Sequence, residues 1–185
     1  MISKDRLAAP HKTEGSVLFE PGKSLEGAIP GSLKTGFECV LNIAIVPTIS
    51  SIPKYVFRYF ENEKAKNNGV TPSFELKLNM QNDITLSVGT LEVAIPVAQA
   101  ARHFQRRTVV NAWAQAKEGV FEIGLSLDNQ HLQMARGNAE VPLGIGYGIW
   151  GGGGLEFTLK DFMIAKKLLH STERKKMQKY FEEKV

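Results

Sequence analysis

Four basic side chains between positions 102 and 107 form the densest group in the chain that could bind an anion. Arg102 and Arg106 are one helical turn apart. His103 and Arg107 repeat that spacing, and Trp113 follows on the same side as the first pair. Arginines beside an aromatic ring suit phosphate groups and stacked bases. The spacing therefore predicts an anion-binding patch, with a solvated helix face paired with acids as the alternative.

The net charge of the chain is concentrated near its C-terminal end. The sequence carries 23 Lys and Arg against 19 Asp and Glu, a formal charge of +4. Residues 160–185 hold eight of the basic and four of the acidic side chains, so the remainder is neutral. Such a segment suits nucleic acid, an anionic membrane surface or an acidic partner, although a solvated helix face has the same composition. The predicted anion-binding residues are Arg102, Arg106, Arg107, Arg174, Lys175, Lys176 and Lys179.

A glycine-rich segment between residues 144 and 154 is the most unusual stretch of the sequence. Its first glycines alternate with large apolar residues, and no Lys-Ser or Lys-Thr pair follows, so it does not fit a phosphate-binding loop. Alternating glycines leave one face of a strand without side chains, so another backbone, a ring or a partner chain can lie against it. We predict a subunit or ligand contact there; close packing inside one subunit is the alternative. The predicted interface residues are Gly144, Gly146, Gly148 and Trp150.

Metal and catalytic motifs are not recognisable in the sequence. The four histidines are scattered at positions 11, 103, 131 and 170, and no two of them have metal-ligand spacing. The single cysteine, Cys39, cannot form an intrachain disulfide or a cysteine-rich zinc site. Ser126, Asp128 and His131 are close in sequence but fall around an expected hairpin tip, which is a poor setting for a triad. We therefore expect no metal, no cofactor and no enzymatic activity.

The order of elements predicts one domain in three parts. Residues 1–36 are rich in Pro and Gly and are expected to form an N-terminal arm. Residues 37–160 are expected to form a β-rich core, in which Phe37–Val46 is apolar on both faces, as in a covered central strand. Residues 161–185 are expected to form a basic C-terminal helix with a cap at Ser171 and Thr172.

A three-strand meander is the clearest local pattern. Apolar residues alternate from Phe74 to Leu78, from Ile84 to Val88 and from Leu91 to Ile95, with turn signals between them. The apolar phase slips by one residue at Gly89-Thr90, and a two-residue hairpin that pairs Val88 with Leu91 accounts for the slip. A bulge at Gly89 is the alternative explanation.

Residues near 96–118 fit the period of an amphipathic helix. Pro96 suits a helix start and Gly119 a helix end. Between them, apolar residues fall on one stripe at 100° per residue. The stripe consists of Val97, Ala101, Phe104, Ala112 and Ala116.

These patterns together predict an α+β fold: a mostly antiparallel twisted sheet or partly closed β-barrel, with one long helix after the meander and a C-terminal helix. The profile favours a non-enzymatic, self-associating structural or assembly protein, a homo-oligomer that contacts nucleic acid or an anionic membrane. Small viral matrix, coat and nucleic-acid-associated proteins share this general profile. The alternatives are a binding module for a small apolar ligand and an enzyme without a readable motif. Because no apolar segment follows the first residues and none is long enough to span a membrane, we expect a cytoplasmic protein.

Overall fold

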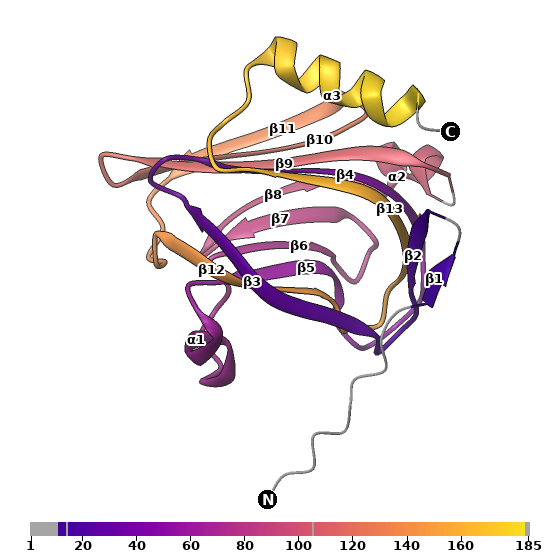
Figure 1. Ribbon diagram of the computed structural model, residues 1–185, viewed down its shortest axis with the longest axis horizontal. Helices are drawn as coiled ribbons and strands as arrows, with labels where there is room; N and C mark the ends of the chain where they lie inside the picture. Colours follow the sequence, from indigo (N-terminus) through magenta and orange to yellow (C-terminus); the bar gives the residue numbers. More distant parts are fainter. Residues whose placement is uncertain (1–10, 14, 105, 184–185) are drawn as a thin grey trace, which may run out of the picture.

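Two antiparallel sheets pack face to face in the computed structural model, which describes residues 11–13, 15–104 and 106–183 (Figure 1). The large sheet has the order β1 (His11–Thr13), β2 (Ser16–Phe19), β13 (Glu156–Ala165), β4 (Phe37–Val46), β9 (Thr108–Lys117), β10 (Val120–Leu127) and β11 (Gln130–Gly137). The small sheet has the order β3 (Ser24–Ser32), β12 (Gly144–Gly151), β5 (Lys54–Phe60), β6 (Phe74–Leu78), β7 (Ile84–Val88) and β8 (Leu91–Ile95). The helices are α1 (Glu63–Asn67), α2 (Val97–Ala100) and α3 (Ser171–Glu183), and a 3₁₀ turn spans Ala101–His103.

Aromatic rings from both sheets fill the space between them. Phe57 and Tyr59 of β5 stack at 4.5 Å between ring centroids, and Phe74 of β6 stacks on Phe57 at 5.5 Å. Phe37 of β4 meets the edges of Tyr59 and Phe74 from the opposite sheet. Such stacked and edge-to-face pairs stabilise a core beyond the area they bury. The core therefore lies between the sheets, as in a β-sandwich.

The predicted meander is confirmed. β6, β7 and β8 are consecutive antiparallel strands, and Val88 pairs with Leu91 across the two-residue turn. The phase slip therefore comes from a hairpin rather than a bulge. The predicted core residues of this segment are all buried: Phe74, Leu76, Leu78, Ile84, Leu86, Val93 and Ile95.

The predictions of a long helix near 96–118 and of an α+β fold are wrong. Only Val97–Ala100 is α-helical there, and Thr108–Lys117 is strand β9 in the middle of the large sheet. Ala112 and Ala116 are four residues apart, a spacing that places side chains on one side of both a helix and a strand. Gly119 ends no helix; with Glu118 it forms the β9–β10 turn, in which both residues have positive φ. The architecture is a sandwich of two sheets rather than one twisted sheet or a barrel.

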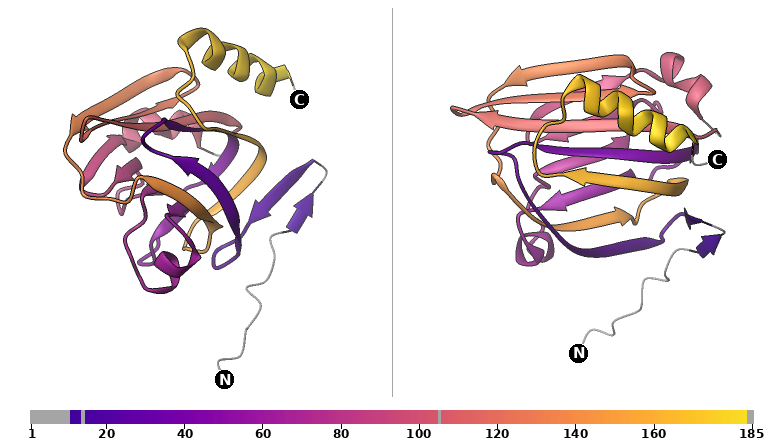
Figure 2. Two further views of the ribbon diagram at one scale, coloured as in Figure 1. Left: turned by 60° about the vertical axis from the view of Figure 1, so that its left-hand side comes forward. Right: turned by 45° about the horizontal axis from the view of Figure 1, so that its top comes forward.

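The segments at the two ends of the chain contribute strands. Residues 16–19 and 24–32 of the predicted N-terminal arm form β2 and β3, whereas residues 1–10 lie outside the described residues. At the other end, β13 continues to Ala165 and the C-terminal helix begins at Ser171 instead of Asp161. Residues 184 and 185 of the predicted helix are also outside the description. α3 lies on the outer face of the large sheet (Figures 1 and 2). Within the described residues, no helix is long and apolar enough to cross a membrane.

The alternating glycines of β12 let other groups approach the strand closely. A Cβ at Gly146 would collide with the carbonyl oxygen of Glu61, and one at Gly148 would meet the Tyr59 ring and Ile29. Trp150 is buried and packs on Phe57, with ring centroids 5.3 Å apart. The prediction that a backbone or a ring lies against these glycines is confirmed, and the partner is the chain itself. A contact of Gly144, Gly146, Gly148 and Trp150 with a second subunit stays a prediction.

We expect Leu86→Ala to lower the free energy of unfolding by about 2–5 kcal/mol, because Leu86 is fully buried between the sheets and its loss leaves a cavity. Urea denaturation measures the change. Leu132→Ala is the control, since that leucine is 55% exposed and should cost little. Equal effects of the two substitutions would contradict the position of the core.

Candidate functional site

Rows of side chains cross the outer face of the large sheet. In one row, Glu38 of β4 lies beside Trp113 of β9, Trp113 beside Gly124 of β10, and Gly124 beside Met134 of β11. The row on one side contains Val40, Asn111 and Ser126, and the row on the other side contains Gln115, Glu122 and Arg136. Because side chains alternate along each strand, the residues of these rows all point away from the core.

Trp113 lies flat across its neighbour in the row. Gly124 permits this, because a Cβ there would coincide with the indole ring. The guanidinium of Arg174 lies over the ring, 5.4 Å from its centroid. The indole is consequently only 5% exposed and forms part of the floor of the outer face. A cation over an indole also stabilises this arrangement.

Arg174 is held in place by a buried ion pair. Its Nε donates to Oε1 of Glu38 at 2.6 Å, and a terminal nitrogen donates to Oε2 at 2.8 Å. The Glu38 side chain is fully buried, and Oε2 also accepts from the backbone N–H of Leu169 at 2.9 Å. This two-point geometry satisfies the carboxylate where water does not reach it. The pair therefore fixes the start of α3 on the sheet.

Local sequence starts the helix at this point. Glu173 accepts the backbone N–H of His170 at 2.7 Å, which is the reciprocal half of a capping box. That hydrogen bond is the main cause of a lowered pKa of Glu173, although its carboxylate remains exposed to solvent. A small apolar cluster below the helix then attaches it to β4 and β9. The cluster consists of Val40, Val109, Leu169 and Phe181.

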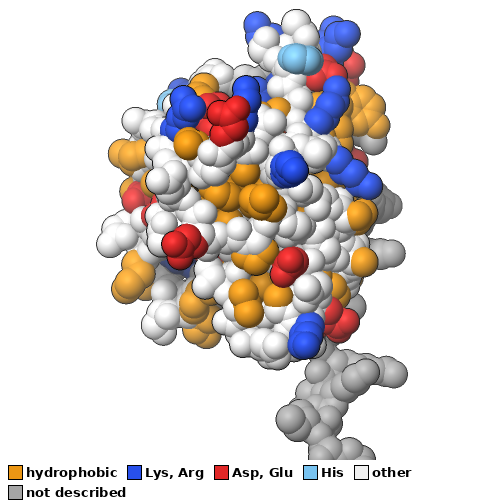
Figure 3. All heavy atoms as spheres, turned by 90° about the vertical axis from the view of Figure 1, so that its left-hand side faces the viewer, with side chains coloured by type: hydrophobic (Ala, Val, Ile, Leu, Met, Phe, Trp, Pro, Cys, Tyr) orange, Lys and Arg blue, Asp and Glu red, His pale blue; other side chains and the backbone are white. Residues whose placement is uncertain are grey.

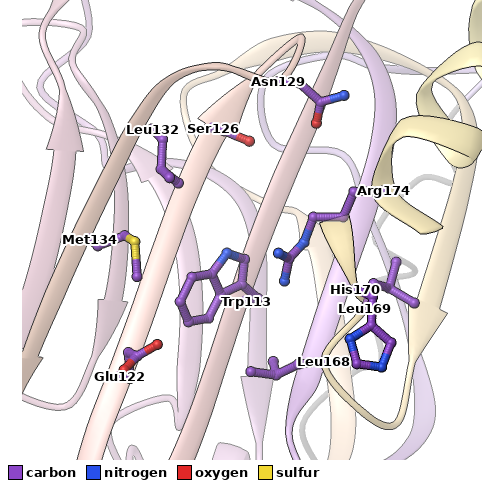
Figure 4. A pocket seen from close by; sticks show the side chains of 10 residues that line it. All are labelled: Trp113, Glu122, Ser126, Asn129, Leu132, Met134, Leu168, Leu169, His170 and Arg174. Atoms are coloured by element: carbon purple, nitrogen blue, oxygen red, sulfur yellow. The ribbon is translucent and has the colours of Figure 1, made fainter. Parts of the chain in front are cut away.

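A pocket of about 430 Å³ lies beside the first turn of α3; we call it the Trp113 pocket. Figure 4 shows its side chains, which come from β9, β10, β11, the β10–β11 turn and the start of α3. Asn129 reaches it from a two-residue turn in which Asp128 and Asn129 both have positive φ. The lining residues are Trp113, Glu122, Ser126, Asn129, Leu132, Met134, Leu168, Leu169, His170 and Arg174.

The chemistry of the Trp113 pocket is that of recognition by hydrogen bonds and apolar contact. It brings together a carboxylate, a hydroxyl, an amide, an imidazole and a guanidinium, which supply both donors and acceptors. Leu132 and Met134 add apolar surface on one side and are more than half exposed. Across the described residues, no group of three or more His, Cys, Asp or Glu side chains could hold a metal ion.

The predicted basic residues do not form a single patch. Arg102 donates to Gln130 at 2.6 Å and contacts His131 at 2.6 Å, and Arg106 lies 3.4 Å from Asp128. Arg174 is engaged by Glu38 as described above. Lys175, Lys176 and Lys179 are exposed on α3, and Arg107 lines a separate pocket near the end of that helix. In Figure 3 most of the visible Lys and Arg side chains lie toward α3. Hydrophobic side chains gather separately, in the middle of that face.

His103 lies at the centre of a polar cluster beside these arginines. Its Nδ1 lies 2.9 Å from Asp128, and its Nε2 lies 3.3 Å from Nε of Arg102, which can only donate. A neutral ring that donates to Asp128 and accepts from Arg102 satisfies both contacts. Burial lowers the pKa of His103, and Asp128 offsets part of that effect. The cluster thus holds the β10–β11 turn against the 3₁₀ turn.

Comparison with solved structures identifies the kind of fold. The metal-free lectin I-B4 from Griffonia simplicifolia is 8% identical, with 84% of this chain and 89% of that chain covered and a TM-score of 0.55. The CBM2 module of the evolved Dit of Lactobacillus casei BL23 phage J-1 is 14% identical, with 85% and 78% covered and a TM-score of 0.52. The potassium-bound carbohydrate recognition domain of Emp46p is 11% identical, with 86% and 87% covered and a TM-score of 0.51.

The chain therefore has a lectin-like β-sandwich fold. No known family model matches the sequence, and no curated protein matches it. The prediction of a self-associating assembly protein that contacts nucleic acid or membrane, of viral type, is wrong. The prediction came from the general profile of a β-rich basic chain with an N-terminal arm and a basic tail, whereas the similar folds are those of carbohydrate-binding proteins. The long helix that was expected to present Arg102, Arg106 and Arg107 is also absent, since Thr108–Lys117 is a strand. Self-association itself stays a prediction.

Sequence reasoning found Trp113 but missed most of its surroundings. Trp113 was assigned to a helix beside Arg102, so its strand neighbour Gly124 went unnoticed. The alternation of Phe121, Ile123 and Leu125 contained the missing signal, because the intervening Glu122, Gly124 and Ser126 must share the opposite face. Glu38 and Arg174 are 136 residues apart in sequence, and nothing local connects them.

We expect Arg174→Ala to weaken the docking of α3 by up to about 3–5 kcal/mol, because it leaves the buried Glu38 carboxylate without its cation. Hydrogen exchange at the Leu169 amide, which donates to Glu38, reports this loss directly. Lys176→Ala on the exposed side of the same helix is the control. Unchanged protection in Arg174→Ala would contradict the role of the ion pair.

We expect the free energy of unfolding to decrease as the pH falls below about 6.5, the ordinary pKa of histidine. Burial lowers the pKa of His103, so the unfolded chain takes up the proton more readily than the folded chain. This contribution is complete above the unfolded pKa and is lost as the pH falls through the lower folded pKa. Urea titrations at pH 7.5 and 5.5 should show a smaller pH effect in His103→Gln than in the exposed control His170→Gln.

Proposed function

We propose that this protein binds carbohydrate in the Trp113 pocket. The observation that carries the proposal is the composition of that pocket: an indole floor and apolar side chains beside five kinds of polar group, on the outer face of a β-sandwich sheet. The solved structures with a similar fold include a lectin, a carbohydrate recognition domain and a CBM2 module. That likeness supports the class of ligand, whereas the choice of pocket depends on the residues of this chain alone.

A sugar ring carries hydroxyl groups around its edge and C–H groups on its faces. Each hydroxyl both donates and accepts, so the carboxylate of Glu122 and the amide of Asn129 suit neighbouring hydroxyls. The C–H face of a sugar packs against apolar surface, and the exposed side chains of Leu132 and Met134 provide such a surface. The volume of about 430 Å³ is within the range of small-molecule sites, about 300–1,000 Å³. The pocket therefore accommodates a sugar without rearrangement of the sheet.

Direct contacts carry this recognition. The similar structures include a potassium-bound and a metal-free form. In the part of the chain that the structure describes, no cluster of His, Cys, Asp or Glu fits a metal. The side chains of the Trp113 pocket supply donors and acceptors that suit direct hydrogen bonds to sugar hydroxyls.

The test is binding of the full chain to an array of neutral, acidic and amino sugars, followed by calorimetric titration of each sugar that binds. Glu122→Gln should weaken binding about 10- to 100-fold, because hydrogen bonds to a charged group contribute about 1.5–3 kcal/mol. Glu156→Gln is the matched control, since Glu156 is also a half-buried carboxylate that points outward from the large sheet.

Two results would sink the proposal. One is the failure of the whole array to bind at millimolar sugar, with the protein shown to be folded. The other is binding that Glu122→Gln and Asn129→Ala leave unchanged. The cytoplasmic location and the homo-oligomer predicted from the sequence stay predictions that these experiments do not address.

A further inference from the structure

A second pocket, of about 420 Å³, lies at the other end of α3 on the same face of the large sheet; we call it the Asn42 pocket. Its walls come from β4, β9, the β10–β11 turn and the last turns of α3. The lining residues are Asn42, Arg106, Arg107, Val109, Asp128, Gln130, Gln178, Phe181 and Glu182. The proposed sugar site does not use any of them.

Two amide side chains leave an acceptor without a partner in the Asn42 pocket. Asn42 is fully buried; its Nδ2 donates to the carbonyl oxygen of Phe181 at 3.3 Å, and its Oδ1 has no partner. Gln178 donates through Nε2 to Glu182 at 2.6 Å, and its Oε1 has no partner either. Buried acceptors of this kind are costly unless a donor reaches them. A ligand that donates hydrogen bonds would satisfy these two acceptors.

The charged side chains of the Asn42 pocket are mostly engaged by other groups. Asp128 accepts from the backbone N–H of Val109 at 2.8 Å and contacts His103 and Arg106 through its other oxygen. Glu182 accepts from Gln178. The buried acceptors without a partner, on Asn42 and Gln178, belong to neutral amides, and neutral donors such as hydroxyl groups suit them.

Strand β9 connects the two pockets. Trp113 lines one and Val109 lines the other, and the two are four residues apart on one strand, about 13 Å. Asn111 lies between them with its side chain on the same face, and its buried Oδ1 also has no partner. Asn129 and Gln130, adjacent in sequence, also line one pocket each. The two pockets therefore lie beside α3 on the same face of the large sheet, one near each end of the helix.

We propose that the ligand is an oligosaccharide whose consecutive sugars occupy the Trp113 pocket and the Asn42 pocket, with hydroxyl groups that donate to Asn42 and Gln178. A single sugar ring is too short to span about 13 Å. This inference rests on the proposed function, since it extends the same site. It identifies the ligand class as a chain of linked neutral sugars rather than a monosaccharide.

The test measures affinity against chain length. Ladders of one to six units of α1,4-glucan, β1,4-glucan, α1,2-mannan and β1,4-galactan are titrated into the full chain by calorimetry. In the ladder that binds, affinity should rise at least 10-fold from the single sugar to a chain that reaches both pockets. Gln178→Leu should abolish that gain and leave the affinity for the single sugar unchanged. Lys175→Leu, exposed on the same helix, is the control for the added leucine.

Nuclear magnetic resonance adds a readout that does not depend on the substitution. The side-chain amide signals of Asn42 and Gln178 should shift with the long chain and not with the single sugar. Affinity independent of length, or a gain that survives in folded Gln178→Leu, would overturn the inference and leave the proposed function intact. The absence of binding for chains of every length would overturn both. If Gln178→Leu does not fold, Gln178→Ala takes its place.

Discussion

The ion pair between Glu38 and Arg174 is the interaction on which the proposed site depends. The ion pair attaches α3 across β4 and β9, and the docked helix then forms one side of the pockets on the outer face of the large sheet. The same guanidinium covers Trp113, and the same carboxylate fixes the loop before the helix through the Leu169 amide. Buried ion pairs contribute little net stability compared with apolar residues of the same shape. Their value here is positional, since two hydrogen bonds in a plane allow one orientation of the helix start.

The sequence predicts those parts of the fold in which the spacing of apolar residues fits a strand and does not also fit a helix. β6, β7 and β8 follow strict alternation with turn residues between them, and the pairing of Val88 with Leu91 across the β7–β8 turn was predictable. Strand β9 was not predictable in this way, because its inward residues after Val110 are alanines, which are poor strand formers. Alanines at every second residue are also found four residues apart, which is the spacing of side chains on one face of a helix. Tertiary pairing with β4 and β10 decides the conformation, and no local signal reports that pairing.

The candidate site was less predictable than the fold for a related reason. Its residues come from strands that are neighbours in the sheet but distant in sequence, and from a helix more than 130 residues after Glu38. Gly124 shows the limit of local reasoning. A glycine inside a strand signals close approach of another group, but only the register with Trp113 identifies that group as an indole. The sequence indicated Trp113 only as an aromatic near the predicted arginine patch, and it could not assign Glu122 and Met134 to its neighbourhood.

α3 serves as both a structural cover and a wall of the proposed site, which couples stability to binding. The apolar cluster below the helix is small, so much of its attachment comes from polar groups: Glu38 at one end and Asn42 at the other. Asn42 and Gln178 retain acceptors that α3 does not satisfy, so the docked helix carries an energetic cost that a donor from a ligand would remove. A ligand that supplies that donor binds only the docked state. By mass action it must therefore stabilise the helix on the sheet as well as occupy the groove beside it.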